Sequence, residues 1–449
     1  MGRLTAHAVD FTLNTRWEDI PAAVQCQAKR CLLDTLGALI AGSRTPVGGI
    51  MRRTARDQFG GDQATILVCG ERSSAAGAAL ANGFFANALD IDDGYRNVKG
   101  HPGACALPPL LAAAELAGGC SGREFLTALV IAYELGIRAG VIRHATYATY
   151  HSSGSWGAVA GAAGAGRLLG LSAAQLRHAV GAAEYHAPIA PMMKGIDTPS
   201  MGKDSIGWGC MVAVLSAVMG RDGFSGIRSL FDDAPEPEWV ESLGRRWEIL
   251  NLYFKPYAAC RWGQPAVAGA IALVREHGLA ASQIRRIRVR AFAAATRLPG
   301  NHPRNTEEAQ YSLAFPVAAA LLDGEVGPAQ VLPPRFFDVD LLNMMDRVVV
   351  EVAPEFEAEF PAKAPVEVLI ETTAGGVLRS GRVEAQWEPP DSLPSDAELE
   401  AKFLWLTTPI LGKLGAETLA TAIRSAERWP SLDAIIYGSR AATGRESLA

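Results

Sequence analysis

The pattern of apolar residues changes near residue 250, and this change limits the chain to a fold with two different parts. Before that point, apolar side chains recur at helical spacing, as at Val24, Cys31, Leu36 and Ile40, and several segments are rich in Ala and Gly. The sequence predicts helices at 17–42, 73–89, 108–117, 124–143, 158–169, 172–184 and 205–219, with a short strand within 62–70.

Strand-like segments follow this change. Residues 284–292 alternate apolar and basic side chains, and 347–352 and 365–373 are also typical of strands. The turn Ala374–Gly376 predicts that 377–387 returns as a hairpin partner. We expect helices at 264–277 and 307–323 among these strands, and a further helix from Ser395 to about Ser425.

These patterns predict a mostly α protein with an α+β part, in which a large all-helical domain carries a smaller inserted α+β lid domain. We expect the first part of the helical domain at 1–255, the lid at 256–392, and C-terminal helices at 393–449 that rejoin the helical domain. The proline-rich segment 389–394 is the predicted linker. A cleft between two domains is the usual place for a small ligand.

Composition excludes several classes of function. The chain of 449 residues has a net charge of −5 and no basic block, which argues against a nucleic-acid partner. We expect no apolar run to reach the length of a transmembrane span, because the longest runs are broken by Gly, Arg or His. The N-terminus lacks the apolar core of a signal peptide, so we expect a cytoplasmic protein without a membrane partner. Seven scattered cysteines without a Cys-x-x-Cys pair argue against a zinc ribbon or an iron–sulfur cluster.

The segment 88–103 concentrates charge between two apolar helices. It contains Asp90, Asp92, Asp93 and His101, together with an arginine and a lysine. Polar groups removed from water must be paired, so this loop is either a functional site on a helical scaffold or an ordinary solvated connection. The residues alone favour neither interpretation.

Other motifs indicate what kind of site to expect. The chain has no Walker A spacing, no Gly-x-Gly-x-x-Gly after a strand and no Gly-x-Ser-x-Gly elbow. The segment 186–204 has three prolines and no helical period, and long irregular loops of this kind are often functional.

Isolated polar residues are therefore the candidates for chemistry. His101 and His151 can exchange protons near neutral pH, or they can be simple loop or helix caps. Lys203, Lys255 and Arg261 suit a substrate that carries carboxylates, although a single cation is more often solvated surface.

A family resemblance rests on the order of these motifs. The string Ala88–Asp93 followed by His101-Pro-Gly resembles the signature of the 2-methylcitrate dehydratase (MmgE/PrpD) family, which also contains cis-aconitate decarboxylase and iminodisuccinate epimerase. Further matching segments follow in order along nearly the whole chain: His151 before a Gly/Ala helix, Lys203–Gly209, Gly223–Gly226, Lys255–Arg261, Ala309–Gly324 and Pro394–Phe403.

The resemblance implies a helical domain with an α+β lid, usually in a homodimer, an active site between the two, and no metal or organic cofactor. Carried over position by position, the implied catalytic residues are Asp90, His101, His151, Lys203 and Lys255. The implied substrate-binding positions are Arg261, Gln264, Ser312 and Gly94.

Three departures from the family pattern leave the reaction open. Gly94 stands where the family often has Thr, Gln264 where it often has His, and Phe315 where it often has Tyr. The first hypothesis is a cofactor-free dehydratase that acts on a hydroxy di- or tricarboxylic acid resembling 2-methylcitrate. The second is an epimerase or decarboxylase of a related polycarboxylate, and the third is an inactive family member that only binds a ligand.

Overall fold

The helical lobe contains most of the chain. The computed structural model describes residues 2–360, 363–390 and 392–441. The helices of this lobe are α1 (Arg3–Asn14), α2 (Ala22–Gly42), α3 (Pro46–Gln58), α4 (Ala75–Asn87), α5 (Pro102–Leu116), α6 (Gly122–Thr146), α7 (Gly154–Leu168), α8 (Ala173–His186), α9 (Met192–Asp197), α10 (Ile206–Arg221), α11 (Glu238–Glu241), α18 (Asp396–Arg424) and α19 (Asp433–Gly438). Two short antiparallel strands, β1 (Ala64–Ile66) and β2 (Glu71–Ser73), accompany them.

The α+β lobe contains one mixed sheet with helices packed on it. Its strands are β3 (Ile284–Ala291), β4 (Val348–Val352), β5 (Val366–Thr372) and β6 (Val377–Val383). They lie in the order β4-β3-β5-β6, with β3 and β4 parallel and the other pairs antiparallel. Its helices are α12 (Gln264–His277), α13 (Thr306–Gln310), α14 (Ala314–Asp323), α15 (Pro328–Val331), α16 (Val339–Met345) and α17 (Pro354–Glu357).

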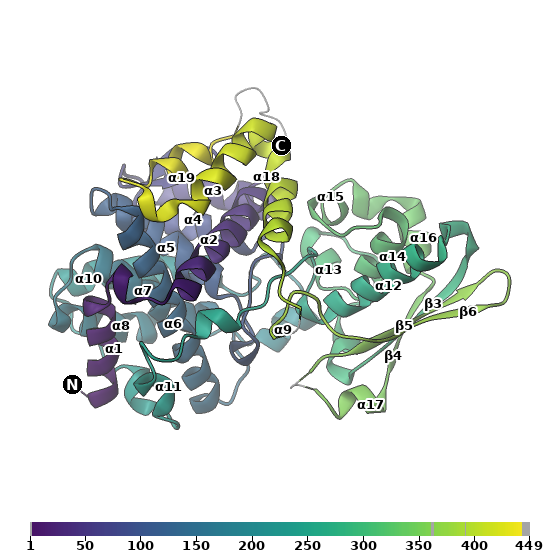
Figure 1. Cartoon of the computed structure of the whole chain (residues 1–449), viewed down its shortest axis with the longest axis horizontal. Coiled ribbons are helices and arrows are strands. Elements are labelled where there is room, and N and C mark those ends of the chain that lie inside the picture. The colour runs from purple at the N-terminus through teal and green to yellow at the C-terminus, as the bar shows by residue number, and fades with distance from the viewer. Residues whose placement is uncertain (1, 361–362, 391, 442–449) are drawn as a thin grey trace.

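Figure 1 shows the two lobes side by side, with the C-terminal α18 and α19 on the helical lobe. The chain therefore leaves the helical lobe, builds the α+β lobe and returns, and α18 packs against α2. The predicted fold class, mostly α with an α+β part, is confirmed.

Serine caps fix several helix starts. The side chains of Ser121, Ser172 and Ser395 each accept a hydrogen bond from a backbone N–H in the first turn of α6, α8 and α18. Such a bond satisfies one of the backbone donors that a helix start leaves unpaired, which is why serine marks the boundary.

Several predicted elements differ from the structure in their boundaries, and three of them differ most. The helix expected at 17–42 begins only at Ala22, because Pro21 precedes it. The helix expected from Pro108 begins six residues earlier, at Pro102, and keeps Pro108 inside it. The helix expected at 307–323 is divided into α13 and α14, since the chain leaves the helical conformation at Tyr311.

The short strand expected within 62–70 is confirmed as β1, and a turn at 67–70 connects it with β2, which lies beyond that segment. The segment 186–204 contains the short helix α9, whose Met192 and Ile196 are buried.

Small residues let the central helices approach closely. A Cβ on Gly157 of α7 would lie 2.3 Å from the Cys105 sulfur of α5, and a Cβ on Gly136 of α6 would lie 2.7 Å from the Cβ of Ala160. Larger side chains at these positions would push the backbones apart, so the glycine content sets the spacing of this core.

The expectation that no apolar segment reaches membrane-spanning length fails for α6. Within the described residues, α6 is long and apolar enough to cross a membrane by length and composition alone. However, 94% of its apolar window is buried inside the molecule, where it packs against α5 and α7. This is the environment of a core helix.

Candidate active site

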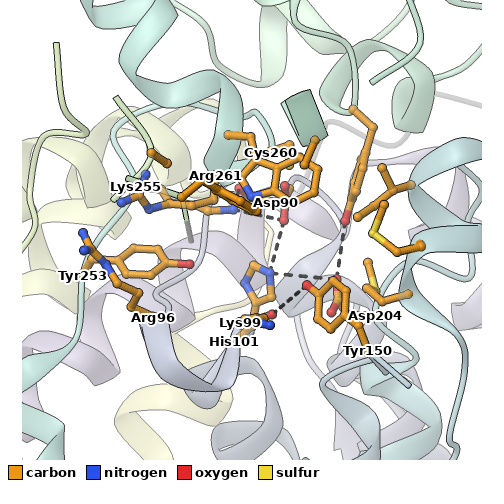
Figure 2. A pocket seen from close by; sticks show the side chains of 18 of the residues that line it. Asp90, Arg96, Lys99, His101, Tyr150, Asp204, Tyr253, Lys255, Cys260 and Arg261 are labelled. Atoms are coloured by element: carbon orange, nitrogen blue, oxygen red, sulfur yellow. Dashed lines mark hydrogen bonds and ion pairs between the residues drawn. The ribbon is translucent and has the colours of Figure 1, made fainter. Parts of the chain in front are cut away.

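A cavity of about 330 Å³ lies between the two lobes. It is lined by Asp90, His101 and Asp204 from the helical lobe, by Lys255 and Arg261 from the connecting segment, and by Tyr311 from the α+β lobe. Figure 2 shows the labelled side chains converging, with Tyr253, Arg96 and Arg261 on one side of His101 and Tyr150 and Asp204 on the other. The cavity thus combines carboxylates, an imidazole and several cations.

The acidic loop after α4 is buried, so the interpretation as an ordinary solvated connection is wrong. Asp90 is 2% exposed, and Asp92 and Asp93 are fully buried. Asp90 also has a left-handed backbone φ of 53°, which residues other than glycine rarely adopt. Backbone strain of this kind persists where the surrounding structure enforces it, and it concentrates at functional sites.

Two lysines surround Asp90. The Lys255 Nζ lies 3.1 Å from Asp90 Oδ1 and donates a hydrogen bond of 2.8 Å to the Asp90 backbone oxygen. The Lys203 Nζ lies 4.0 Å from Asp90 Oδ1 and donates to Asn87 O at 2.6 Å and Gln310 Oε1 at 2.8 Å. Burial lowers the pKa of Lys203, although the nearby Asp90 carboxylate acts in the opposite direction. Lys255 lines the cavity, whereas Lys203 supports the loop beneath it.

His101 lies between carboxylates on both edges of its ring. Its Nδ1 is 3.0 Å from Asp92 Oδ2, and its Nε2 is 3.4 Å from Asp90 Oδ1 and 3.9 Å from Asp204 Oδ2. The contact with Asp92 has the distance of an ion pair but not the angle of a hydrogen bond. The opposite edge, bearing Nε2, faces the cavity residues Asp90 and Asp204.

The charges of this pair support one another. Burial opposes the positive charge on His101, but the carboxylates of Asp92 and Asp204 together outweigh it, so the pKa of His101 is raised. Burial likewise opposes the charge on Asp92, but His101, Lys255 and Asn87 together outweigh it and the pKa of Asp92 is lowered. The imidazole therefore holds its proton more tightly than a free histidine, which suits a proton donor.

Asp204 joins the site from the segment before α10. Its Oδ1 accepts a hydrogen bond of 3.0 Å from Ser153 Oγ, and its Oδ2 accepts one of 3.4 Å from the Tyr311 hydroxyl. Asp204 thereby connects the helical lobe, through Ser153 at the start of α7, with the α+β lobe. One of its oxygens stays close to His101, so it can exchange a proton with substrate.

A second buried network lies behind the loop. Lys402 of α18 donates hydrogen bonds to Asp34 Oδ1 and to the backbone oxygen of Ile91, at 2.5 and 2.6 Å. Asp93 accepts from the Tyr133 hydroxyl at 2.6 Å, and burial together with Asp34 raises the pKa of Asp93 to about 7. The C-terminal helix therefore holds the loop that carries Asp90 and Asp92.

His151 does not line this cavity. Its ring stacks on His144 with centroids 4.4 Å apart, and its Nδ1 lies 2.7 Å from Ser155 Oγ. Burial, with His144 and Arg143 nearby, lowers the pKa of His151 to about 4. The structure thus brings Asp90, His101, Lys255 and the neighbouring Lys203 together, but it leaves the second predicted histidine outside.

The predicted substrate-binding positions also include both residues that line the cavity and residues that do not. Arg261 lines the cavity, whereas Gln264 donates to Tyr257 O and Ala259 O, and Ser312 caps α14 by accepting from Phe315 N. Gly94 pairs through its backbone with Tyr253, and a Cβ at Gly94 would lie 2.2 Å from the Tyr253 ring. The absence of a side chain at Gly94 lets Tyr253 occupy this part of the wall.

Sequence reasoning missed several lining residues. Asp204 and Tyr311 are adjacent in sequence to two predicted site residues, Lys203 and Ser312. This adjacency could have identified them as candidates. Tyr150 and Tyr253 carried no such signal, because a tyrosine beside a loop is more often ordinary packing.

Asp90, Asp92 and His101 also have the side-chain types of a metal site, with ligand atoms within 4.8 Å of one another. The Lys255 ammonium lies 3.1 Å from Asp90 Oδ1, which is the place where a cation would bind. Lysine therefore supplies positive charge at this carboxylate, and a metal ion would have to compete with it.

Comparison with known proteins agrees with this geometry. The MmgE/PrpD N-terminal domain matches residues 6–237 and the MmgE/PrpD C-terminal domain matches residues 257–428. The cis-aconitate decarboxylase-like protein oryM of Aspergillus oryzae is 27% identical over 79% of this chain and 81% of its own length. The cis-aconitate decarboxylases of Aspergillus terreus and Homo sapiens are 23% and 24% identical, over 88% and 89% of this chain and 84% and 87% of their own. Both parts of the chain match the family, and the chain therefore belongs to the MmgE/PrpD family.

Proposed function

We propose that this protein is a lyase that acts on a small di- or tricarboxylic acid, at the carbon next to a carboxylate, without a metal or organic cofactor. One observation carries the proposal. His101 is buried with a raised pKa, and it faces a cavity whose other charged groups include Lys255 and Arg261. A proton donor beside fixed cations suits a reaction in which negative charge develops on carbon and is then neutralised by protonation.

The cations have the role of stabilising that charge. Lys255 is 1% exposed and is fixed by the Asp90 backbone oxygen and side chain. A positive group fixed before the reaction needs no reorganisation when charge develops, and at a buried position its effect is larger than in bulk water. Lys255 would stabilise the enolate-like species, and Arg261 would hold a substrate carboxylate.

Decarboxylation fits the available proton donors. Loss of carbon dioxide breaks one carbon–carbon bond and leaves the electron pair on carbon, which then takes the proton from His101 Nε2. This reaction needs an acid but no base to remove a proton from carbon. Among the described residues that line the cavity, His101 is the single histidine, and the relatives reported above are named for decarboxylation of cis-aconitate.

Dehydration of a hydroxy acid such as 2-methylcitrate is the second candidate, and the position of Asp204 favours it. Dehydration needs a base that removes the proton next to a carboxylate and an acid that protonates the leaving hydroxyl. Asp204 Oδ2 lies 3.9 Å from His101 Nε2, so a carboxylate and an imidazolium face the same space. Asp204, rather than His151, would then be the base.

Proton NMR in D₂O distinguishes these reactions. The chelator-treated protein is incubated separately with cis-aconitate, 2-methylcitrate, citrate and iminodisuccinate. We expect loss of carbon dioxide from cis-aconitate with a solvent-derived deuterium in the product, or new olefinic signals from a hydroxy acid. A His101→Asn variant is the matched control and should abolish either signal.

Other outcomes would change the proposal. Exchange of an α-proton in iminodisuccinate without an alkene would replace the lyase by an epimerase. Activity that disappears with chelator and returns with a divalent cation would assign the cluster of Asp90, Asp92 and His101 to a metal. No reaction with any of these acids would contradict the proposal.

A further inference from the structure

Glu388 lies in the segment that returns from the α+β lobe, next to two arginines that line the cavity. It is 8% exposed, and its two carboxylate oxygens contact two different arginines. Arg96 Nη2 lies 2.6 Å from Glu388 Oε1, and Arg261 Nη2 lies 2.5 Å from Glu388 Oε2. Both arginines line the cavity, and they come from the helical lobe and from the connecting segment, respectively.

The backbone around Glu388 is fixed to the same segment that carries Lys255. The Phe254 N–H donates a hydrogen bond of 3.0 Å to the Trp387 oxygen, and Trp387 has a left-handed φ of 63°. The Glu388 N–H donates to Ser392 Oγ at 3.1 Å. A carboxylate held in this way can define where its two arginine partners lie.

Arg261 has donor capacity left after it binds Glu388. Its Cζ lies 5.0 Å from the centre of the Tyr253 ring, so the guanidinium also stacks on an aromatic face. Within the described part of the chain, Arg261 Nη1 is buried and has no hydrogen-bond partner. A buried donor without a partner is costly, and a carboxylate is the group that a guanidinium binds best.

We infer that Glu388 is a positioning residue that fixes Arg261 as the subsite for a substrate carboxylate remote from the reacting carbon. The inference rests on the proposed function, because that function places the reacting carbon next to His101 and Lys255. Glu388 fixes Nη2 and leaves Nη1 to receive the remote carboxylate, while Arg96 balances Glu388 from the other side. The subsite selects acids that carry a carboxylate on an additional arm.

Ligand binding tests the inference without any turnover. The probes are tricarballylate, a saturated tricarboxylate, and succinate, which is the same acid without one carboxymethyl arm. Isothermal titration calorimetry of the whole protein and of Glu388→Asp gives both dissociation constants. Shortening the side chain keeps its charge but withdraws it from the arginines, so we expect about tenfold weaker tricarballylate binding and less than a twofold change for succinate.

A double-variant cycle separates positioning from a structural role. In an Arg261→Ala background, the additional Glu388→Asp change should alter tricarballylate binding by less than twofold, because Glu388 acts through Arg261. With a substrate that is turned over, Glu388→Asp should raise KM while kcat stays within about threefold.

Glu367→Asp is the matched control. Glu367 also bridges two arginines of the α+β lobe, with Arg290 at 2.6 Å and Arg379 at 3.4 Å, but neither of these arginines lines the cavity. Its variant should bind both acids like the unchanged protein, and thermal unfolding should show that both variants fold.

Several results would overturn the inference. These are unchanged tricarballylate binding in Glu388→Asp, equal weakening of both acids, additive effects in the double variant, or no binding of tricarballylate by the unchanged protein. If binding behaves as expected but none of the acids is converted, the proposed function fails and the subsite remains.

Discussion

His101 and Asp92 form a buried ion pair in which Nδ1 lies 3.0 Å from Oδ2, and this pair favours the protonated imidazole. Asp92→Asn removes the carboxylate that contributes most to raising the pKa of His101, so this pKa should fall. The protonated fraction then falls at neutral pH, and kcat at pH 7 should decrease by at least about tenfold. The alkaline limb of the pH–rate profile should move to lower pH.

Asp93→Asn is the control for this variant. Asp93 is the next residue, but it bonds to Tyr133 and to the Gly103 N–H rather than to His101. Its variant should keep the position of the alkaline limb. An Asp92→Asn enzyme with an unshifted profile would show that the ion pair does not control the proton donor.

Lys255 should matter to the chemical step and not only to binding. Its ammonium is fixed beside Asp90 at the cavity wall, where it can stabilise charge that develops in the transition state. We expect Lys255→Ala to reduce kcat by about 10² or more. Lys203→Ala should also reduce kcat, by a smaller factor, because Lys203 supports the loop through Asn87 and Gln310.

Steady-state kinetics of both variants checks this ranking. Thermal unfolding is needed in parallel, since both lysines contribute hydrogen bonds to the buried loop. Unchanged kcat in both variants would refute the role of the lysines in catalysis.

The two predicted histidines should have pKa values on opposite sides of the usual value for histidine. The pKa of His151 is lowered to about 4, first by burial and then by His144, whereas that of His101 is raised above its usual 6.5. Nitrogen NMR of labelled imidazoles should show His151 neutral down to about pH 4 and His101 charged at pH 6.5. The signals are assigned with His151→Gln and His101→Asn.

These shifts have opposite effects on stability. His151 binds its proton less readily in the folded state, so it should reduce stability as the pH falls below 6.5. His101 should contribute stability that is fully present below pH 6.5 and lost as the pH rises through its folded pKa. If His151→Gln does not reduce the loss of stability between pH 6.5 and 4, the lowered pKa of His151 is wrong.

A buried ion pair in α6 should dominate the stability of its surroundings. Glu134 and Arg138 are fully buried, with Arg138 Nη1 2.5 Å from Glu134 Oε2, and Glu134 also accepts from the Glu248 and Ile249 N–H groups. Arg138→Met leaves that carboxylate uncompensated, and breaking such a pair costs about 3–5 kcal/mol. Urea unfolding measures the loss.

Lys413 and Glu417 provide the comparison, since they have the same spacing in α18 but are largely exposed. Lys413→Met should change stability by less than about 0.5 kcal/mol. A loss in Arg138→Met as small as this would mean that water reaches the pair.

Much of the fold followed from local sequence. The helical spacing of apolar residues, the serines before α6, α8 and α18, and the alternation in 284–291 all act within a few residues, so they could be read without a structure. Asp90 and His101 also lie in one short loop, where eleven residues already bring them close. The boundary errors arose where two signals competed, as at Pro102 and Pro108, either of which can occupy a first helical turn.

The composition of the site depended on contacts that only the tertiary structure sets. Arg96 and Glu388 are separated by 292 positions, Lys255 and Asp90 by 165, and Tyr311 and Asp204 by 107. Local sequence patterns do not predict such contacts, because the contacts depend on how α18 packs on α2 and how the α+β lobe packs on the helical lobe. The sequence by itself determined the elements and the reactive loop, whereas the packing of two lobes decided which side chains share the cavity and left His151 outside it.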